Sequence, residues 1–156
     1  MAATKCCDLS GAVELIWQSM VGVPLEPGIP HTPTEADNKK MWVSSVVQLY
    51  GDWNGAIRID CTWDLARQAT AHMYGIEGNA VPSDDTCDAV AELTNVIAGM
   101  VKPMLGLRSH HSLPTVVRGT RYETTLPYGK SQQQCGFGSG DNCLCVTILK
   151  RGARPN

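Results

Sequence analysis

The sequence predicts one α+β domain, in which helices pack on a mostly antiparallel β-sheet. Three observations lead to this prediction. Three segments repeat apolar residues at helical spacing. Four strand-like segments are joined in pairs across short glycine-containing turns, which is typical of β-hairpins. The 156 residues are 43% hydrophobic and 18% charged, a composition that supports one sizeable core and excludes a disordered chain.

The first half of the chain predicts a helix followed by a hairpin. Ser10 is the expected N-cap of the helix, and Gly22 follows its end. Four prolines then favour an extended edge segment or a loop. The predicted elements are a helix over Leu9–Val21, an extended segment over residues 24–33, and the strands Met41–Tyr50 and Ala56–Cys61. Residues 1–8 are expected to form a loose arm.

The second half adds one helix and then repeats the same order. The predicted elements are helices over Thr62–Tyr74 and Asp84–Lys102, a connection over Leu105–His111, a strand over Leu113–Thr120, and a hairpin of Gln132–Phe137 and Cys143–Leu149. Pro103 is expected to end the longer helix. The order helix, extended segment and hairpin thus occurs in residues 9–61 and again in residues 84–149. Residues 150–156 are expected to be a loose tail of the single domain 1–156.

The helix predicted over Asp84–Lys102 has an unusual polar face. Its apolar stripe consists of Val90, Leu93, Ile97 and Val101. Opposite the stripe, within roughly 60° of arc, lies what we call the acid–amide face, made of Asp88, Glu92, Asn95 and Gly99, with Ala91 and Ala98 beside it. A glycine inside a helix costs about 1 kcal/mol relative to alanine, so Gly99 needs a reason.

The acid–amide face also lacks the cations of an ordinary helix surface. Such a surface would carry Lys or Arg four residues from its acids, yet no cation occurs between Asp84 and Val101. Small residues around an acid and an amide would let another surface approach closely. A solvent-exposed face that merely lacks lysine is the alternative, and composition alone leaves it open.

The spacing Asp88-x3-Glu92-x2-Asn95 resembles the D/S-x3-E-x2-N motif of the CheC/CheX/FliY phosphatases. These bacterial proteins dephosphorylate the chemotaxis response regulator CheY. The stretches ELTNVIAG in the helix and SLPTVVRG in the following strand (Ser112–Gly119) resemble the CheX branch in particular. The resemblance extends roughly from the first helix to the last strand. It implies a fold built from tandem duplicated α-β-β-β units, which matches the repeated order of elements.

The resemblance also implies roles for the acid–amide face. Asn95 would orient the water that attacks the aspartyl phosphate, and Glu92 would contact the active-site lysine of the receiver domain. Asp88 would support the face, while Ala91, Ala98 and Gly99 would allow close docking because of their size. The chain would need no cofactor of its own, since Mg²⁺ would be carried by the phosphorylated CheY-type partner. A cytoplasmic homodimer, formed by extension of an exposed sheet edge, is implied as well.

The first predicted helix carries a related but altered pattern. Ser10-x3-Glu14-x2-Trp17 has tryptophan where the motif has asparagine. We therefore assign no catalytic role to Glu14. Trp17 is expected to serve the core or an interface, because its large amphipathic ring suits either.

Other chemistries have less support in the sequence. Seven cysteines are an odd number, and their spacing lacks the ligand pairs of a zinc site, so we expect reduced thiols. A net charge of −2 without basic clusters favours neither nucleic acid nor a membrane surface. The glycine-rich stretch 136–142 lacks the helix of a phosphate-binding loop and predicts a hairpin turn.

Two non-catalytic functions remain as alternatives. In the first, the same helix face binds a receiver domain, or docks into a flagellar-switch-like assembly, without hydrolysis. In the second, the chain is a structural dimerisation domain, which leaves the acid–amide face without an explanation. The presence of both Glu92 and Asn95 favours the phosphatase.

Overall fold

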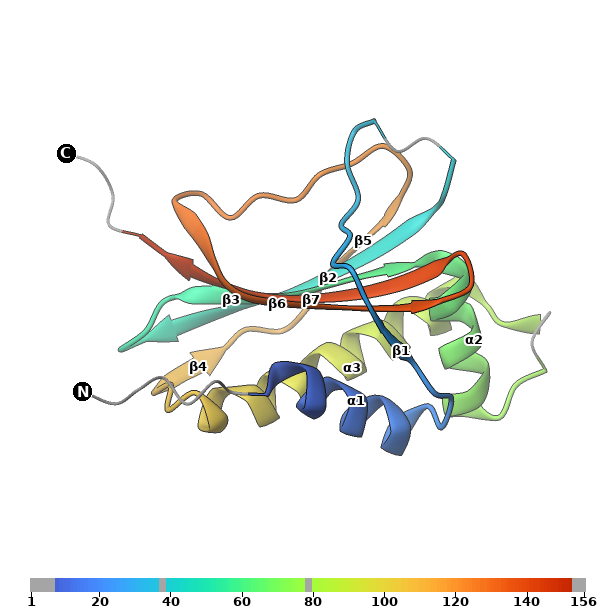
Figure 1. The fold of residues 1–156 in the computed structure, drawn as a ribbon, viewed down its shortest axis with the longest axis horizontal. Coiled ribbons are helices and arrows are strands. Elements are labelled where there is room, and N and C mark those ends of the chain that lie inside the picture. The colour runs from blue at the N-terminus through green and yellow to red at the C-terminus, as the bar shows by residue number, and fades with distance from the viewer. Residues whose placement is uncertain (1–7, 37–38, 78–79, 153–156) are drawn as a thin grey trace.

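The computed structural model describes residues 8–36, 39–77 and 80–152. Its helices are α1 (Leu9–Met20), α2 (Trp63–Tyr74) and α3 (Ser83–Met104). Its strands are β1 (Glu26–Gly28), β2 (Trp42–Gly51), β3 (Gly55–Thr62), β4 (Ser109–His111), β5 (Thr115–Gly119), β6 (Gly129–Ser139) and β7 (Asn142–Arg151). In this part of the chain, three helices cover one face of a seven-stranded antiparallel sheet, which confirms the predicted α+β class (Figure 1).

The order of strands in the sheet reflects two related halves. The strands follow the order β1-β6-β7-β3-β2-β4, and β5 also pairs with β2. The central pair β3–β7 joins the halves, with Ile57 opposite Ile148. An outer strand of each half pairs with a strand of the other half. β1 of the first half pairs with β6, and β5 of the second half pairs with β2. The order α-β-β-β therefore occurs twice, as α1-β1-β2-β3 and as α3-β5-β6-β7, with the short strand β4 added between α3 and β5.

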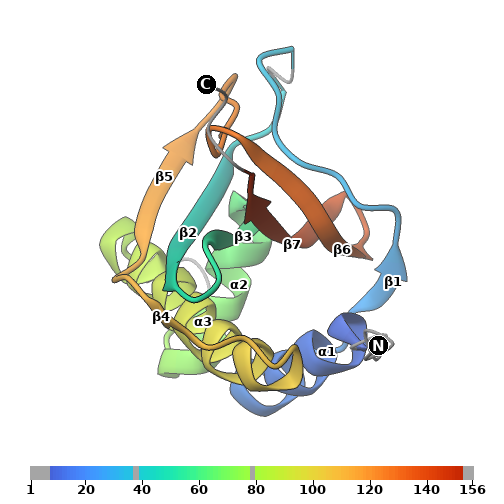
Figure 2. The same ribbon diagram turned by 90° about the vertical axis from the view of Figure 1, so that its left-hand side faces the viewer.

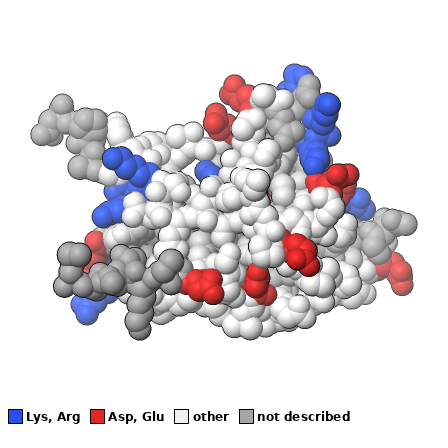
Figure 3. Space-filling view, in the orientation of Figure 1, with Lys and Arg blue, Asp and Glu red and all other residues white. Residues whose placement is uncertain are grey.

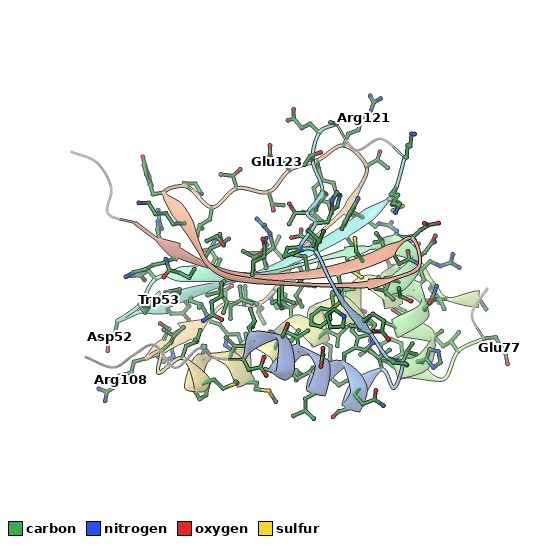
Figure 4. All side chains as sticks on the ribbon, viewed as in Figure 1. Asp52, Trp53, Glu77, Arg108, Arg121 and Glu123 are labelled. Carbon is green, nitrogen blue, oxygen red and sulfur yellow. The ribbon has the colours of Figure 1, made fainter. Side chains whose placement is uncertain are left out.

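The hydrophobic core fills the space between the sheet and the helices, as Figure 4 shows. The predicted apolar stripe of α3 is wholly buried there, and Figure 2 shows α3 lying along the sheet beside α1. Trp17 is 3% exposed, so it belongs to the core, although its indole nitrogen has no hydrogen-bond partner among the described residues. Within the described chain, no helix is both long and apolar enough to cross a membrane.

Local hydrogen bonding explains where the helix ends differ from the prediction. Asp8, not Ser10, caps α1, and its Oδ1 accepts a 2.8 Å hydrogen bond from the Gly11 amide. Pro103 lies inside the last turn of α3 and does not stop it. A proline at this position removes only one backbone hydrogen bond of the helix, and Leu105 N again donates to Val101 O at 3.0 Å.

Long-range pairing explains the differences among the strands. β4 lies in the segment predicted as a connection, and it forms because His110 pairs with Tyr50 of β2. β6 begins at Gly129, three residues before the predicted start, and β7 continues through Lys150 and Arg151, which were expected in the loose tail. Asp8, expected in the loose arm, caps α1, and Gly152 N donates to Tyr128 O at 2.7 Å. The remaining residues of the two expected tails, 1–7 and 153–156, lie outside the described residues.

The sheet face away from the helices is covered by two chain connections. Figure 2 shows the β1–β2 and β5–β6 connections arching over this face. Arg121 and Glu123 of the β5–β6 connection point away from the sheet (Figure 4). Because both faces are covered, β7 is buried on both sides, where Cys145 and Thr147 alternate with buried apolar residues. The described cysteines are free thiols.

Candidate functional site

The acid–amide face lies on the outer side of α3, because the opposite side of the helix is held in the core. Asp88, Glu92 and Gly99 are exposed, and Asn95 is half-buried. Their spacing of three and four residues places them along one side of the helix, one turn apart. The structure therefore brings together the four residues of the predicted face.

The two alanines beside the face differ in exposure. Ala91 is half-buried at the margin of the acid–amide face. Ala98 is completely buried and belongs to the hydrophobic core, so its expected place on a docking surface is wrong. Ala98 lies about 80° around the helix axis from Asp88, so the Ala98 side chain falls outside the exposed arc.

The charged and amide groups of this face have no partners in the part of the chain that the structure describes. Among the described residues, Asp88 and Glu92 form no ion pair, and the Asn95 side chain forms no hydrogen bond. By contrast, the neighbouring Thr94 is buried and satisfied, since its hydroxyl donates to Val90 O at 2.7 Å. The polar atoms of the acid–amide face are therefore available to a group outside the chain.

Packing does not require a glycine at position 99. A Cβ atom built there would meet nothing within 4 Å, and the residue lies inside a helix. The fold therefore tolerates alanine, which is the better helix former. Close approach by another molecule is the remaining physical reason for a residue without a side chain at this position.

Tyr74, the last residue of α2, lies next to the face and was not predicted. α2 packs against α3, and the Tyr74 side chain is 44% exposed. Partial burial and the charges of Asp88, Asp85 and Glu92 raise the pKa of the Tyr74 hydroxyl. Helical spacing places Tyr74 at the end of its own helix but gives no sign of which α3 residues it faces.

The site is a convex surface and not a pocket. Four hollows of the described surface, of 390 to 670 Å³, are lined by other residues. One of them lies beside α1 and is lined by Glu14 and Trp17, the residues of the altered first motif. In the view of Figure 3, acidic groups are spread over the helix layer. A convex face of this kind suits a protein partner better than an enclosed small molecule.

The described part of the chain is thus an α+β domain with an exposed carboxylate and an accessible amide on the outer face of α3. A family model described as chemotaxis phosphatase CheX matches residues 43–148, which include the acid–amide face. The chain therefore belongs to the CheX family of chemotaxis phosphatases. No curated protein matches its sequence.

Solved structures share the fold at low sequence identity. CheX from Vibrio vulnificus is 20% identical, with a TM-score of 0.75 over 96% of this chain and 99% of that chain. A CheC-like superfamily protein from Shewanella sp. PV-4 is 23% identical, with a TM-score of 0.71 over 97% of this chain and 100% of that chain. A chain in the crystal structure of the CheX-CheY-BeF3-Mg²⁺ complex from Borrelia burgdorferi is 21% identical. Its TM-score is 0.65, and the match covers 92% of this chain and 96% of that chain.

Proposed function

We propose that this chain hydrolyses the aspartyl phosphate of a phosphorylated CheY-type receiver domain in the cytoplasm, using Glu92 and Asn95. The observation that carries the proposal is an exposed carboxylate, without a partner among the described residues, and an accessible amide one turn away on α3, within the segment that matches the family. Hydrolysis of a phosphoryl group depends mainly on placing water and balancing charge. Neither task requires a nucleophile from this chain.

Asn95 is the proposed positioning group for the attacking water. Its side-chain carbonyl can accept a hydrogen bond from the water, while its NH2 group can donate to an oxygen of the phosphoryl group. The water oxygen then forms a bond to phosphorus as the bond between phosphorus and the aspartyl oxygen breaks. The products are a free aspartate carboxylate on the receiver and inorganic phosphate.

Glu92 is the proposed anchor for a cation of the receiver. A carboxylate and a lysine ammonium form a charge-assisted hydrogen bond, which is stronger than a neutral one. Because Glu92 has no cation of its own among the described residues, it can form that pair only with a partner. Asp88, one turn earlier, adds to the negative potential that attracts the lysine.

The metal ion of the reaction is proposed to come with the receiver. Within the described residues no cluster of three or more His, Cys, Asp or Glu could hold a metal ion. The acid–amide face itself supplies only two carboxylates, both exposed. The Borrelia complex contains CheY together with Mg²⁺. We therefore assign no metal ligand to this chain.

A homodimer formed through β5 is part of the proposal. Among the described strands β5 pairs only with β2, so its other edge is free. Val117 on β5 is 42% exposed and the preceding Leu113 is 86% exposed, which gives this edge apolar groups to bury. The opposite edge strand, β1, has three residues and contains Pro27, which cannot donate a backbone hydrogen bond.

Turnover of a phosphorylated receiver tests the function directly. A CheY-type receiver is phosphorylated with labelled phosphate in Mg²⁺, and its loss of label is followed with and without a substoichiometric amount of this protein. Catalytic acceleration supports the proposal. Binding without acceleration, across several receivers, would instead favour the non-catalytic interaction module.

A further inference from the structure

The end of α2 and the first half of α3 form one continuous surface. α2 ends at Tyr74, and α3 begins at Ser83 after a short connection. The two helices pack against each other, and the carboxylates of Asp88 and Glu92 on α3 are near enough to the Tyr74 hydroxyl for their charges to raise its pKa. Gly75 follows Tyr74 in the left-handed conformation, with φ of 65°, and turns the chain away. The Tyr74 side chain stays at the surface as a result.

The acid–amide face has no large apolar group of its own. Its members are two carboxylates, an amide and a glycine, with Ala91 at the margin. Stable protein interfaces contain a buried anchor, most often Trp, Tyr or Arg, surrounded by weaker contacts. Tyr74 is an exposed aromatic residue whose hydroxyl is close enough to Asp88 and Glu92 for their charges to raise its pKa. As a phenol, the Tyr74 hydroxyl can donate a hydrogen bond to a partner.

We propose that Tyr74 is a binding residue of the phosphatase, whose ring contacts the receiver beside the acid–amide face and sets affinity but not the rate of hydrolysis. This proposal rests on the proposed function, because it takes a receiver domain as the partner that docks on α3. An amphipathic ring suits the position, since it can bury its apolar faces against the partner while its hydroxyl stays beside the carboxylates.

The contact predicts different results for different replacements of Tyr74. Tyr74→Ala removes the ring, and we expect the receiver concentration for half-maximal rate to rise about tenfold, as for an interface anchor. The rate at saturating receiver should not change, because Tyr74 touches neither the water nor the phosphoryl group. Tyr74→Phe keeps the ring and should bind nearly as well as the wild type. If Tyr74 had a purely structural role, Tyr74→Ala would lower the melting temperature and would not weaken receiver affinity while leaving the saturated rate unchanged.

Tyr128 offers a matched control. It is 49% exposed, similar to Tyr74, and belongs to the β5–β6 connection, which Figure 1 shows on the side of the sheet away from the helices. Tyr128→Ala should leave both affinity and rate unchanged. If Tyr74→Ala folds poorly, Tyr74→Gln removes the ring while keeping a good helix former, and it should show the same loss of affinity.

Binding and turnover are measured separately, so that this inference and the proposed function can fail independently. Binding is titrated with a receiver held in its activated form by beryllofluoride and Mg²⁺, and turnover uses the phosphorylated receiver. Weaker binding of Tyr74→Ala supports the contact even if the wild type shows no hydrolysis, an outcome that would overturn only the enzymatic function. Unchanged binding by both Tyr74→Ala and Tyr74→Gln would overturn the contact, whatever the turnover. No binding by the wild type to any receiver would overturn both.

Discussion

Arg58 and Asp60 lie two residues apart on β3 and form an ion pair, with 2.8 Å between Arg58 Nε and Asp60 Oδ2, in which Asp60 is buried and Arg58 is partly buried. The second carboxylate oxygen accepts a 2.5 Å hydrogen bond from the Ser44 hydroxyl, which is also 2.8 Å from the hydroxyl of Tyr122. Tyr122 belongs to the β5–β6 connection. The pair therefore ties this connection to the sheet face opposite the one that carries α3.

Loss of Arg58 should destabilise the fold in a pH-dependent way. Burial raises the pKa of Asp60, while Arg58 and the Ser44 hydrogen bond oppose the increase. In Arg58→Met the buried carboxylate loses its cation, and the free energy of unfolding should fall by about 3–5 kcal/mol near neutral pH. The pKa of Asp60 would rise further above its unfolded value. The folded state would then bind the proton more tightly, so stability would be highest at acidic pH and would fall as pH rises through the folded pKa.

Urea denaturation at several pH values checks this prediction. Adding Asp60→Asn to Arg58→Met removes the titrating group and should abolish the extra dependence on pH. Stability of Arg58→Met that increases from pH 5 to pH 8 would contradict the assignment of Asp60 as the group responsible.

Gly99→Ala should stabilise the free protein and weaken its action on the receiver. A Cβ atom at this position meets nothing within 4 Å, so the gain is the helix propensity of alanine, roughly 0.5–1 kcal/mol. The same methyl group would intrude on a closely docked partner and reduce turnover. Thermal unfolding and turnover are measured on the same samples. Ser19→Ala, an exposed substitution on α1, is the control and should stabilise the helix without loss of turnover. Full turnover by Gly99→Ala would show that Gly99 is not part of the docking surface.

Glu92 and Glu14 occupy related positions in the two halves and should respond differently to alanine. Both side chains are exposed, so neither change should affect folding much. Glu92→Ala should weaken receiver binding and turnover together, because the pair with the receiver's lysine is lost. Glu14→Ala should leave both unchanged, because Trp17 fills the core where the motif has an asparagine. Complete loss of turnover in Glu14→Ala would show that the first half carries a site after all.

The free edge of β5 should decide the oligomeric state. Light scattering at micromolar concentration should give the mass of a dimer for the wild type. Val117→Lys places a charge on the exposed edge and should shift the mass towards the monomer. Ile29→Lys, at an 89% exposed position next to β1, is the control at the opposite edge and should remain a dimer. A monomeric wild type would rule out the proposed dimer.

The sequence was most informative where one local pattern determines the outcome. The periodicity of α3 gave its buried stripe and its exposed acid–amide face, since a long helix obeys one repeat over many residues. Ala98 was misplaced because it lies at the margin of the exposed arc, where the neighbouring structure decides burial. The bounds of α1 were close, but Asp8 rather than Ser10 supplies the cap.

Features that depend on distant parts of the chain were not predictable in the same way. β4 has little strand character, and it forms because β2 offers an unpaired partner. The position of Tyr74 beside Glu92 depends on how α2 packs against α3. Likewise, Arg58 and Asp60 alternate with apolar residues as a solvent-facing pair would. Asp60 is nonetheless buried and Arg58 partly buried, because the β5–β6 connection packs over this face and its Thr124 carbonyl accepts a hydrogen bond from Arg58.

The most direct test of the proposed activity is the loss of phosphate from a phosphorylated CheY-type receiver in Mg²⁺, compared between the wild type and Asn95→Ala. The account predicts rapid loss with the wild type and, with the variant, a decrease in rate on the order of 100-fold, as for removal of one positioning hydrogen-bond group. Binding of the beryllofluoride-activated receiver should be retained. Gln18→Ala, which removes an exposed amide from α1, should behave as the wild type. Equal rates for the wild type and Asn95→Ala would contradict the central claim that Asn95 positions the attacking water.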